Sequence, residues 1–560
     1  MFMKKSRCTL YLFIFLKLTV CISQALSDED ISRLDSLLKP FDAEDKPGGY
    51  FIIRKDKEVW YEKAFGLADV ANHVPIQKST TFNIASLSKQ FTARCIFHLE
   101  KQGLLSLSDP INDYLPEYGL DSSIHVNHLM SHSSGIWDYV AMMGMTLNLR
   151  ERSMTSKNIE SLIRQAGTPF FSAGTDHLYS NSGYFLLGQL VERVSGMSLR
   201  NFAAKNIFGP LGMDNTYFHD IKGESDAGKA RGYSPKRSGK FRVDEWDEGV
   251  VGDHNLITSP EDLIKWADNF HSSHLGDNLE KLSSTLQEDR SSSAGFSVPY
   301  VGGLYRSRWN QLTVYGHGGR SNGFRCRMAL IPQAGISVIF LTNSTASRPL
   351  DHFNYILELV LKCYEESSPL SSIVPLTTGI YMDNSSGSLL WLSDNGEQQY
   401  LLNGRTLLER YQGNKWRSPG SQFIEPYLDS IENVPMLNYY ATHYEMTRYK
   451  LINDDLNSSL SWVDDEHLGR YENQNLGLRV KIKRKNDQLK LSYLRVEGKP
   501  LVRLVGWAFS FPLSTVKREF LYLPLGDVSI QYVTNTEGSY LTEGFFLTGQ
   551  RFRNLFFKKL

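Results

Sequence analysis

The chain has 560 residues with 61 basic and 61 acidic side chains, so its formal net charge is zero. At about 150 residues per domain, that length indicates three or four domains, or one large domain with appendages. A hydrophobic content of 41% with 22% charged residues argues against a disordered protein, and the balanced charge gives no basic footprint for a nucleic-acid partner.

The N-terminus has the pattern of a targeting segment. A positive stretch at residues 4–7 precedes an almost wholly apolar run, Leu10–Ile22, and small residues follow up to Ala25. This order predicts a secretory signal peptide that is cleaved near Ala25. A membrane anchor is the alternative, but Lys17 interrupts the run, which is short for a span of about 20 residues. We therefore expect a periplasmic or secreted protein without a membrane span after cleavage.

After cleavage the remaining cysteines are Cys95, Cys326 and Cys363. They are too few for a disulfide framework, although one bridge is possible, and no cysteine or histidine spacing suggests a metal site. We expect neither a metal nor a cofactor. Cys326 lies in Phe324–Leu330, where alternate positions are apolar, which indicates an inward strand residue rather than a nucleophile.

Residues 48–364 mix helical and strand patterns. A β-hairpin is predicted for Tyr50–Asp69, with a charged turn at Lys55-Asp56-Lys57. The further elements that we predict are helices at Ser86–Gln102, Ser182–Val194, Ser259–Phe270 and His352–Tyr364, and strands at Leu312–Tyr315, Phe324–Leu330 and Ile336–Leu341. Because short turns join successive strands, we expect an α/β fold with a central antiparallel sheet flanked by helices.

Beyond about Ser367 helical signals nearly vanish. Short alternating strands recur with turns such as Asn395-Gly396 and Asn486-Asp487. The segment Gly379–Asn384 resembles Gly469–Asn473, which suggests two small antiparallel barrels of about 90 residues each. Chance similarity between two β-domains is the alternative.

The first of three chemical motifs is Ser86-Leu87-Ser88-Lys89. Residues three apart at a helix start share a face, so a lysine ammonium can lie beside the serine hydroxyl and help to remove its proton. The same spacing at Ser36–Lys39 and Ser514–Lys517 lies in a charged helix and in β-sequence, where we expect surface positions. Ser86 precedes an amphipathic run, so we expect it to open a buried helix whose N–H groups face anionic chemistry.

The second motif is Tyr179-Ser180-Asn181, before a predicted helix near Gly183. A tyrosinate can act as base for a serine when a nearby ammonium lowers the pKa of the phenol, and an asparagine can hold a substrate carbonyl. The alternative is an ordinary turn before a helix. The same spacing at Tyr471-Glu472-Asn473 indicates only such a structural feature.

The third motif is Tyr315–Arg320, with His317 and Gly319 at its centre. Glycines on a strand edge let a substrate backbone come close, and a backbone N–H there can face an oxyanion. The pattern His-x-Gly also occurs at residues 274–276 and 467–469, so this motif is unspecific by itself.

The order and spacing of the three motifs resemble those of the penicillin-recognising serine hydrolases, which include class C β-lactamases, D,D-peptidases, esterases and D-aminopeptidases. Three further segments are similar to that family: Asn127–Ile136, Phe208–Thr216 and Leu256–Leu263. The resemblance runs from about Gly49 to Tyr364 and implies a β-lactamase-like catalytic domain.

The resemblance also implies an acyl-enzyme mechanism. Ser86 would be the nucleophile, Lys89 its proton-transfer partner and Tyr179 the general base. Asn181 would hold the substrate amide, and the N–H groups of Ser86 and Arg320 would form the oxyanion hole. The expected site thus comprises catalytic Ser86, Lys89, Tyr179 and His317, and substrate-binding Asn181, Gly319 and Arg320.

Two departures from the family pattern bear on the substrate. The run Gly252-Asp253-His254-Asn255 replaces a glycine-rich segment, which predicts a bulkier or more polar pocket wall. His317 stands where β-lactamases have lysine, and a neutral imidazole is a weaker anion site near pH 7. This fits esterases and aminopeptidases better than true β-lactamases.

The whole layout resembles bacterial D-aminopeptidases, in which a catalytic domain precedes two antiparallel barrels and a loop from the last barrel reaches the active site. Leu525-Gly526-Asp527 is the candidate for such a loop. The predicted division is a signal peptide at 1–25, a catalytic domain at 26–366, and barrels at 367–462 and 463–560.

We therefore expect an exported serine hydrolase that cleaves a small peptide, amide or ester, most similar to a D-aminopeptidase. A secreted carboxylesterase or a β-lactamase or D,D-peptidase-like enzyme is the alternative. A catalytically inactive binding protein of the same fold is a third reading, against which the intact Ser86, Lys89, Tyr179 and Asn181 argue. The physiological substrate, the stereochemical preference and the oligomeric state stay open at this point.

Overall fold

The structure is a computed structural model. It describes residues 26–39, 42–145, 155–221, 228–236, 238–244, 249–272, 300–309, 312–321, 323–345, 353–362 and 376–382, and beyond these the separate strands between residues 389 and 559. The predicted signal peptide, Cys363 and the segment 514–517 lie outside the described residues.

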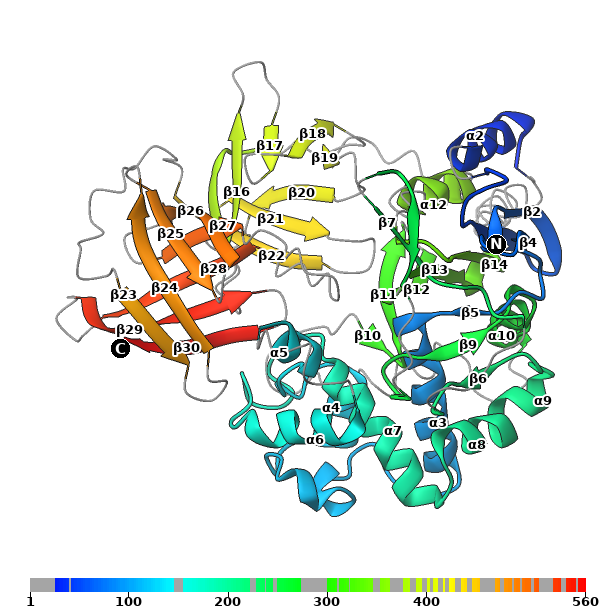
Figure 1. The fold of residues 1–560 in the computed structure, drawn as a ribbon, viewed down its shortest axis with the longest axis horizontal. Coiled ribbons are helices and arrows are strands. Elements are labelled where there is room, and N and C mark those ends of the chain that lie inside the picture. Colours follow the sequence, from blue (N-terminus) through cyan, green and yellow to red (C-terminus); the bar gives the residue numbers. More distant parts are fainter. Residues whose placement is uncertain are drawn as a thin grey trace, which may run out of the picture.

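A seven-stranded antiparallel sheet, with strand order β10-β11-β12-β13-β14-β1-β2, forms the centre of the first part of the chain (Figure 1). Its strands are β1 (Gly49–Lys55), β2 (Glu58–Phe65), β10 (Tyr300–Val301), β11 (Leu304–Trp309), β12 (Leu312–Ser321), β13 (Phe324–Ile331) and β14 (Ile336–Thr342). The predicted hairpin and the three successive strands are confirmed, and β12 extends beyond its predicted end at Tyr315. Pairing of β1 with β14 sets Gly49 opposite Thr342 and so joins the two ends of this domain.

Helices flank the sheet, as predicted. They are α2 (Asp28–Leu38), α3 (Lys89–Lys101), α4 (Val126–Met130), α5 (Tyr139–Met145), α6 (Ser156–Gln165), α7 (Asn181–Ser195), α8 (Leu199–Ala203), α9 (Gly209–Leu211), α10 (Pro260–Ser272) and α12 (Phe353–Leu361). Figure 1 shows α3 to α8 gathered in the lower part of the view, whereas α2 and α12 lie together at the upper right. An ion pair between Asp30 on α2 and Lys362, directly after α12, joins this second group.

The predicted helix at Ser86 begins differently from the expectation. Ser86 lies in a 3₁₀ turn, η2 (Ala85–Ser88), and the α-helix α3 starts only at Lys89. Ala85 has a φ of 49°, in the left-handed region that a non-glycine residue rarely adopts. Because this backbone angle cannot continue into an α-helix, the chain turns sharply at the serine before α3 begins. Likewise α7 starts at Asn181 rather than near Gly183.

A small sheet brings distant segments to this turn. Its strands, in the order β5-β9-β6, are β5 (Phe82–Asn83), β9 (Leu256–Thr258) and β6 (Tyr217–Phe218). β5 leads directly into η2, and β9 follows the run that replaces the glycine-rich segment. Asn83 lies opposite Ile257, so residues 252–255 lie next to the start of α3.

The remaining short elements connect the main ones. They are β3 (Leu67–Asp69), β4 (Val74–Pro75), β7 (Tyr233–Pro235) and β8 (Phe241–Val243), the 3₁₀ turns η3 (Ile111–Asp113), η4 (Pro116–Tyr118) and η7 (Pro332–Ala334), and the π-helical turn η6 (Ala204–Phe208).

The C-terminal half forms two closed antiparallel barrels of eight strands, β15–β22 and β23–β30 (Figure 1). The first contains β15 (Gly379–Met382), β16 (Leu389–Asp394), β17 (Tyr400–Leu402), β18 (Thr406–Arg410), β19 (Trp416–Arg417), β20 (Phe423–Leu428), β21 (Pro435–Tyr440) and β22 (Met446–Asn453). The second contains β23 (Gly469–Asn473), β24 (Leu478–Lys485), β25 (Gln488–Tyr493), β26 (Val496–Leu504), β27 (Ala508–Pro512), β28 (Asp527–Thr534), β29 (Tyr540–Gly549) and β30 (Phe552–Lys559).

The barrels account for the sequence echo. The two similar segments are β15 and β23, the opening strand of each barrel, so the resemblance between them reflects equivalent positions. The turns at Asn395-Gly396 and Asn486-Asp487 lie outside the described residues, as do Leu525 and Gly526, and Asp527 begins β28. The residue boundaries that divide the chain into domains stay predictions.

The cysteines and the helices bear on two further expectations. Cys326 lies on β13 with 2% of its surface exposed, as predicted, and both it and Cys95 are free thiols. The possible bridge therefore does not join these two residues. Among the helices of the described residues, none combines the length and the apolar character that a membrane crossing requires.

Candidate active site

Ser86 occupies a sharp turn that neighbouring side chains hold in place. The Ala85 N–H donates to Asn83 Oδ1 at 2.9 Å, and Asn83 Nδ2 donates to Asn255 Oδ1 at 2.8 Å. Asn255 is itself in the left-handed region, with a φ of 72°. Strained backbone angles of this kind cost on the order of 1–3 kcal/mol each and persist where the surroundings hold them. The turn before Ser86 is therefore fixed by contacts from two segments of the chain.

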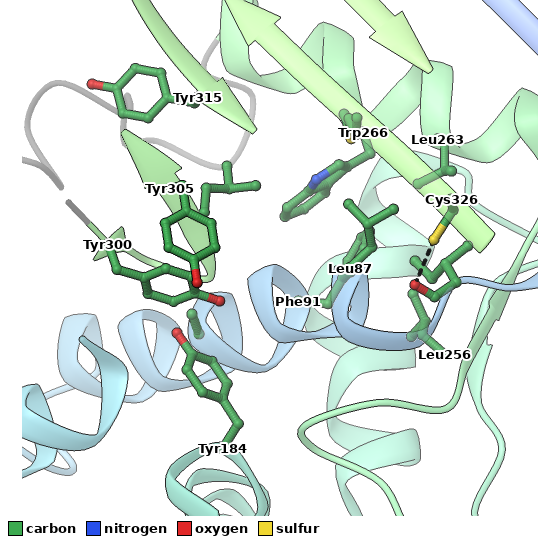
Figure 2. Packing of buried hydrophobic residues seen from close by; sticks show 14 of the residues in the cluster. Leu87, Phe91, Tyr184, Leu256, Leu263, Trp266, Tyr300, Tyr305, Tyr315 and Cys326 are labelled. Atoms are coloured by element: carbon green, nitrogen blue, oxygen red, sulfur yellow. Dashed lines mark hydrogen bonds between the residues drawn. The ribbon is translucent and has the colours of Figure 1, made fainter. Parts of the chain in front are cut away.

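Strand β12 packs directly against this turn. A Cβ atom added at Gly319 would lie 2.2 Å from the Ile84 carbonyl oxygen and 2.4 Å from Cys326 Sγ. Cys326 donates its thiol hydrogen to the same Ile84 oxygen at 2.9 Å, the dashed line in Figure 2. Burial raises the pKa of the Cys326 thiol, so it keeps the proton that it donates. The missing side chain of Gly319 thus makes room for the protein's own serine turn, and the expected approach of a substrate to this glycine stays a prediction.

Lys89, the first residue of α3, is fully buried. Its Nζ donates to Ser86 Oγ at 3.3 Å, to Asn181 Oδ1 at 2.9 Å and to the Asp253 backbone oxygen at 2.7 Å. An ammonium carries three donors, and each has an acceptor here. The structure therefore brings Ser86, Lys89 and Asn181 together, as their motifs predict.

Tyr179 lies immediately before α7 and beside Lys89. The Lys89 Nζ is 5.0 Å from the centroid of the Tyr179 ring and 5.7 Å from that of Tyr184. A nearby cation stabilises a phenolate and attracts an aromatic face. Burial raises the pKa of Tyr184 well above its ordinary value, so this phenol stays protonated. Tyr179 is only partly buried, which makes it the better base of the two.

Further aromatic rings surround Tyr179. The ring centroid of His132 lies 4.2 Å away, that of His317 6.0 Å away and that of Tyr305 6.4 Å away. Figure 2 shows the hydroxyl groups of Tyr184, Tyr300 and Tyr305 converging beside α3. The pKa of Tyr300 is raised well above its ordinary value, first by burial and then by the neighbouring tyrosines. The base thus lies among aromatic rings that carry hydroxyl and imidazole groups.

The third motif lies along β12. His317 is buried, with 4% of its surface exposed, and its Nδ1 is hydrogen-bonded to the Gly318 carbonyl oxygen. An acceptor at Nδ1 places the hydrogen of the neutral ring on that nitrogen. The side chain of Arg320 is exposed, and the part of its backbone N–H in an oxyanion hole stays a prediction.

Asn181 has a different environment from the expected one. Its Oδ1 accepts from Lys89, and its Nδ2 donates to Asp138 Oδ1 at 3.0 Å and to Asp138 Oδ2 at 3.3 Å. Asn181 is 5% exposed. Its side-chain amide therefore engages the protein with both its oxygen and its nitrogen, and the contact with a substrate amide stays a prediction.

The motifs did not include two buried acids behind Lys89. Asp138 follows the family-like stretch by two residues, and Asp253 lies in the run noted as a departure from the family. Asp253 was expected in a pocket wall, but it lies beneath the site with 2% of its surface exposed. Burial by itself would raise the pKa of Asp253, but His254, Lys89 and Tyr139 together hold it below the ordinary value.

No cluster of three or more histidine, cysteine or acidic residues is arranged to hold a metal ion among the residues that the structure describes. The chemistry that these residues can perform is nucleophilic attack by a serine next to a buried ammonium and a tyrosine.

Comparisons with known proteins agree with this arrangement. The chain is 27% identical over 382 residues to the D-aminopeptidase of Brucella anthropi, a match that covers 66% of this chain and 70% of that protein. It is 27% identical over 246 residues to penicillin-binding protein 4* of Bacillus subtilis (strain 168), covering 42% of this chain. That match spans 54% of the length of the Bacillus protein, about half.

Among solved structures, the octameric penicillin-binding protein homologue from Pyrococcus abyssi superimposes with a TM-score of 0.52 and 23% identity, over 84% of this chain and 99% of that one. At this identity the likeness concerns the fold alone. The model of the β-lactamase family matches residues 34–361, more than half of the chain, and this range contains every motif residue described above. With its serine, lysine and tyrosine gathered at one turn of this fold, the chain belongs to the β-lactamase family of serine hydrolases.

Proposed function

We propose that the protein is an exported amidase or aminopeptidase of the D-aminopeptidase type, which cleaves its substrate through an acyl-enzyme on Ser86. The single observation that carries the proposal is the 3.3 Å contact between the buried Lys89 Nζ and Ser86 Oγ. The similarity to D-aminopeptidases, which extends over 66% of this chain, supports an amide substrate.

The arrangement suggests the order of proton transfers. Ser86 Oγ attacks the substrate carbonyl carbon while its proton passes to the Tyr179 phenolate, which Lys89 stabilises. The proton then goes to the leaving nitrogen, and the C–N bond breaks to give an ester on Ser86. Water attacks this ester while Tyr179 again accepts the proton, and Tyr179 returns that proton to Ser86 Oγ as the C–O bond breaks and the acid is released.

A secreted esterase is the second candidate, because of His317. An imidazole is largely neutral near pH 7, so this ring, unlike the lysine of β-lactamases, offers no permanent positive charge for a substrate carboxylate. That property suits an ester or a free amine as well as an amide. It argues against a substrate whose recognition depends on a carboxylate, as in β-lactams.

A fluorophosphonate probe tests the enzyme reading. We expect the wild-type protein to be labelled on one serine and Ser86→Ala to remain unlabelled while it folds normally. Absence of labelling dependent on Ser86, together with no turnover of activated esters, would show a binding protein of this fold instead.

Substrate panels separate the two candidate activities. We expect turnover of D-aminoacyl p-nitroanilides above that of the L-enantiomers and above the level of Ser86→Ala. Turnover of p-nitrophenyl esters without any rate on aminoacyl anilides would replace the aminopeptidase proposal with an esterase.

Export is tested separately, because it depends on residues 1–25 alone. We expect the mature protein in the periplasm or the medium to begin near Leu26, as read by N-terminal sequencing. An uncleaved protein that stays in the cytoplasm would contradict this part of the proposal.

A further inference from the structure

Two buried carboxylates lie behind Lys89, and the proposed reaction uses neither. Asp138 is 1% exposed and Asp253 is 2% exposed. Burying a carboxylate is costly unless hydrogen bonds and an opposite charge compensate. Both carboxylates belong to one network with the Lys89 ammonium, which suggests a role in placing that charge.

Asp138 acts on Lys89 through the Asn181 amide. Its Oδ1 accepts from the Asn181 backbone N–H at 3.1 Å and from Nδ2 at 3.0 Å. A carboxylate only accepts hydrogen bonds and an ammonium only donates them, so the amide nitrogen must face Asp138 and the amide oxygen must face Lys89. The carboxylate thus determines which end of the amide meets the ammonium.

Asp253 acts on Lys89 through its own main chain and its charge. Its backbone oxygen accepts from Lys89 Nζ at 2.7 Å. Its side chain is held in turn, since Oδ2 accepts from the Tyr139 hydroxyl at 2.8 Å and Oδ1 is bonded to His254 Nδ1 at 3.0 Å. Tyr139 directly follows Asp138 in the chain. The same two-residue segment therefore supplies one of the acids and a hydrogen bond to the other.

The other titratable groups around this network come from three places. Tyr179 and Tyr184 face the ammonium from the start of α7, and His132 packs on Tyr179. Beyond Tyr179 lie His317, Tyr300 and Tyr305. Next to Asp253 the groups are Tyr139 and His254, both bonded to its carboxylate. Lys89 thus contacts Asp253 through the backbone oxygen of the acid and Tyr179 through the ring of the tyrosine.

We propose that Asp138 and Asp253 are positioning residues that hold Lys89 as an ammonium pointing at Ser86, one through the Asn181 amide and the other through its main chain and charge. A lysine held in this way acts as a fixed positive charge for the proton transfer, and the phenolate of Tyr179 is left as the proton acceptor. The inference rests on the proposed serine hydrolase chemistry.

The test uses Asp253→Asn and Asp138→Asn in the full chain, two nearly isosteric changes that remove one charge each. The first readout is the titration of the Lys89 side chain by ¹³C NMR of its Cε, a measurement that needs no turnover. The second is the rate of fluorophosphonate labelling of Ser86 across pH. Asp30→Asn is the matched control, since Asp30 is 2% exposed and paired with Lys362 on the far group of helices.

In Asp253→Asn we expect Lys89 to titrate about one pH unit or more below the wild type, and the alkaline limb of the labelling profile to move with it. Asp138→Asn should move the titration and the labelling profile in the same direction by less, because Asp138 acts through an amide. Asp30→Asn should move neither.

If Asp253→Asn fails to fold, the Lys89 titration in Asp138→Asn decides. An unchanged Lys89 titration, or labelling lowered equally at every pH, would overturn the proposal. Absence of labelling in the wild type contradicts the proposed function instead, and the NMR titration still decides on the two acids.

Discussion

The ammonium of Lys89 lies 5.0 Å from the ring centroid of Tyr179, while its hydrogen bonds go to Ser86, Asn181 and Asp253. The cation therefore lies close to the phenol ring while it donates to the serine hydroxyl. This geometry lets one buried charge stabilise a phenolate and hold the serine hydroxyl at the same time. It also predicts how the two tyrosines next to Lys89 differ.

Tyr179→Phe should lower kcat by about 10²- to 10⁴-fold, the usual contribution of a general base. The ring and its contact with the ammonium remain, so KM and the melting temperature should change little. Steady-state kinetics on the best substrate of the panels measure kcat and KM, and a thermal melt gives the melting temperature.

Tyr184→Phe is the matched control, because the Tyr184 hydroxyl donates to the Met130 oxygen at 2.7 Å and burial keeps it protonated. It should cost about 1 kcal/mol of stability and leave kcat within a few-fold. Equal losses of activity in both variants would argue against Tyr179 as the base.

Gly319→Ala should disrupt the serine turn. The added Cβ would lie 2.2 Å from the Ile84 oxygen and 2.4 Å from Cys326 Sγ, so β12 or the turn must move. We expect a loss of about 1–3 kcal/mol in the free energy of unfolding, as for other overpacked sites, together with much slower labelling of Ser86. Gly318→Ala is the control one residue away, since its Cβ would meet its nearest atom, the Cys326 oxygen, at an ordinary 3.8 Å. Similar effects of the two substitutions would show that the close approach at Gly319 is not what matters.

Local sequence patterns correctly predict the spacing of the serine motif, the order of the central strands and the two barrels. The three-residue spacing from Ser86 to Lys89 survives the change from an α-helix to a 3₁₀ turn, because both conformations bring residues three apart to one side. Short turns between successive strands gave the antiparallel order of β12, β13 and β14 correctly. The echo between β15 and β23 indicated two barrels because equivalent strands carry similar side-chain patterns.

The buried acids could not be inferred in the same way. Tyr139 and Asp253 are hydrogen-bonded but 114 residues apart in the chain, and no periodic pattern links them. Gly319 does not have a left-handed φ, so its requirement for glycine comes from the close approach of Ile84 and Cys326. The motif correctly predicts that Asn181 lies near the serine. Whether its amide oxygen or its amide nitrogen faces Lys89 depends on Asp138, which lies outside the three motifs. Contacts between distant segments, rather than local propensity, determine these features.

Asn181→Leu separates two roles for this residue. If the amide positions Lys89, as its contacts with Asp138 and Lys89 indicate, kcat should fall at least tenfold with KM nearly unchanged. The Asp138 carboxylate then also loses the hydrogen bonds from the Asn181 side chain, which should cost about 1–3 kcal/mol in the free energy of unfolding. Kinetics and urea unfolding measure the two effects. A raised KM with an unchanged kcat would instead support the role in substrate binding that the motif predicts.

Acid should destabilise the protein through Asp253 and Asp30. Hydrogen bonds and neighbouring cations hold the pKa of each carboxyl below its ordinary value despite burial, which would raise it. The unfolded chain therefore binds their protons at a higher pH than the folded protein does. Their contribution to stability is complete above the ordinary carboxyl pKa of about 4, and it is lost as the pH falls through the lower pKa values of the folded protein.

We expect the free energy of unfolding in urea to decrease from pH 5 to pH 3. Asp253→Asn and Asp30→Asn should each make this decrease smaller and should each lower the stability at pH 7. An unchanged slope in both variants would mean that other carboxyls cause the acid sensitivity. Because Asp253 contacts Lys89 and Asp30 does not, a shifted pH profile of Ser86 labelling in the first variant alone would separate the catalytic effect of the charge from its effect on stability.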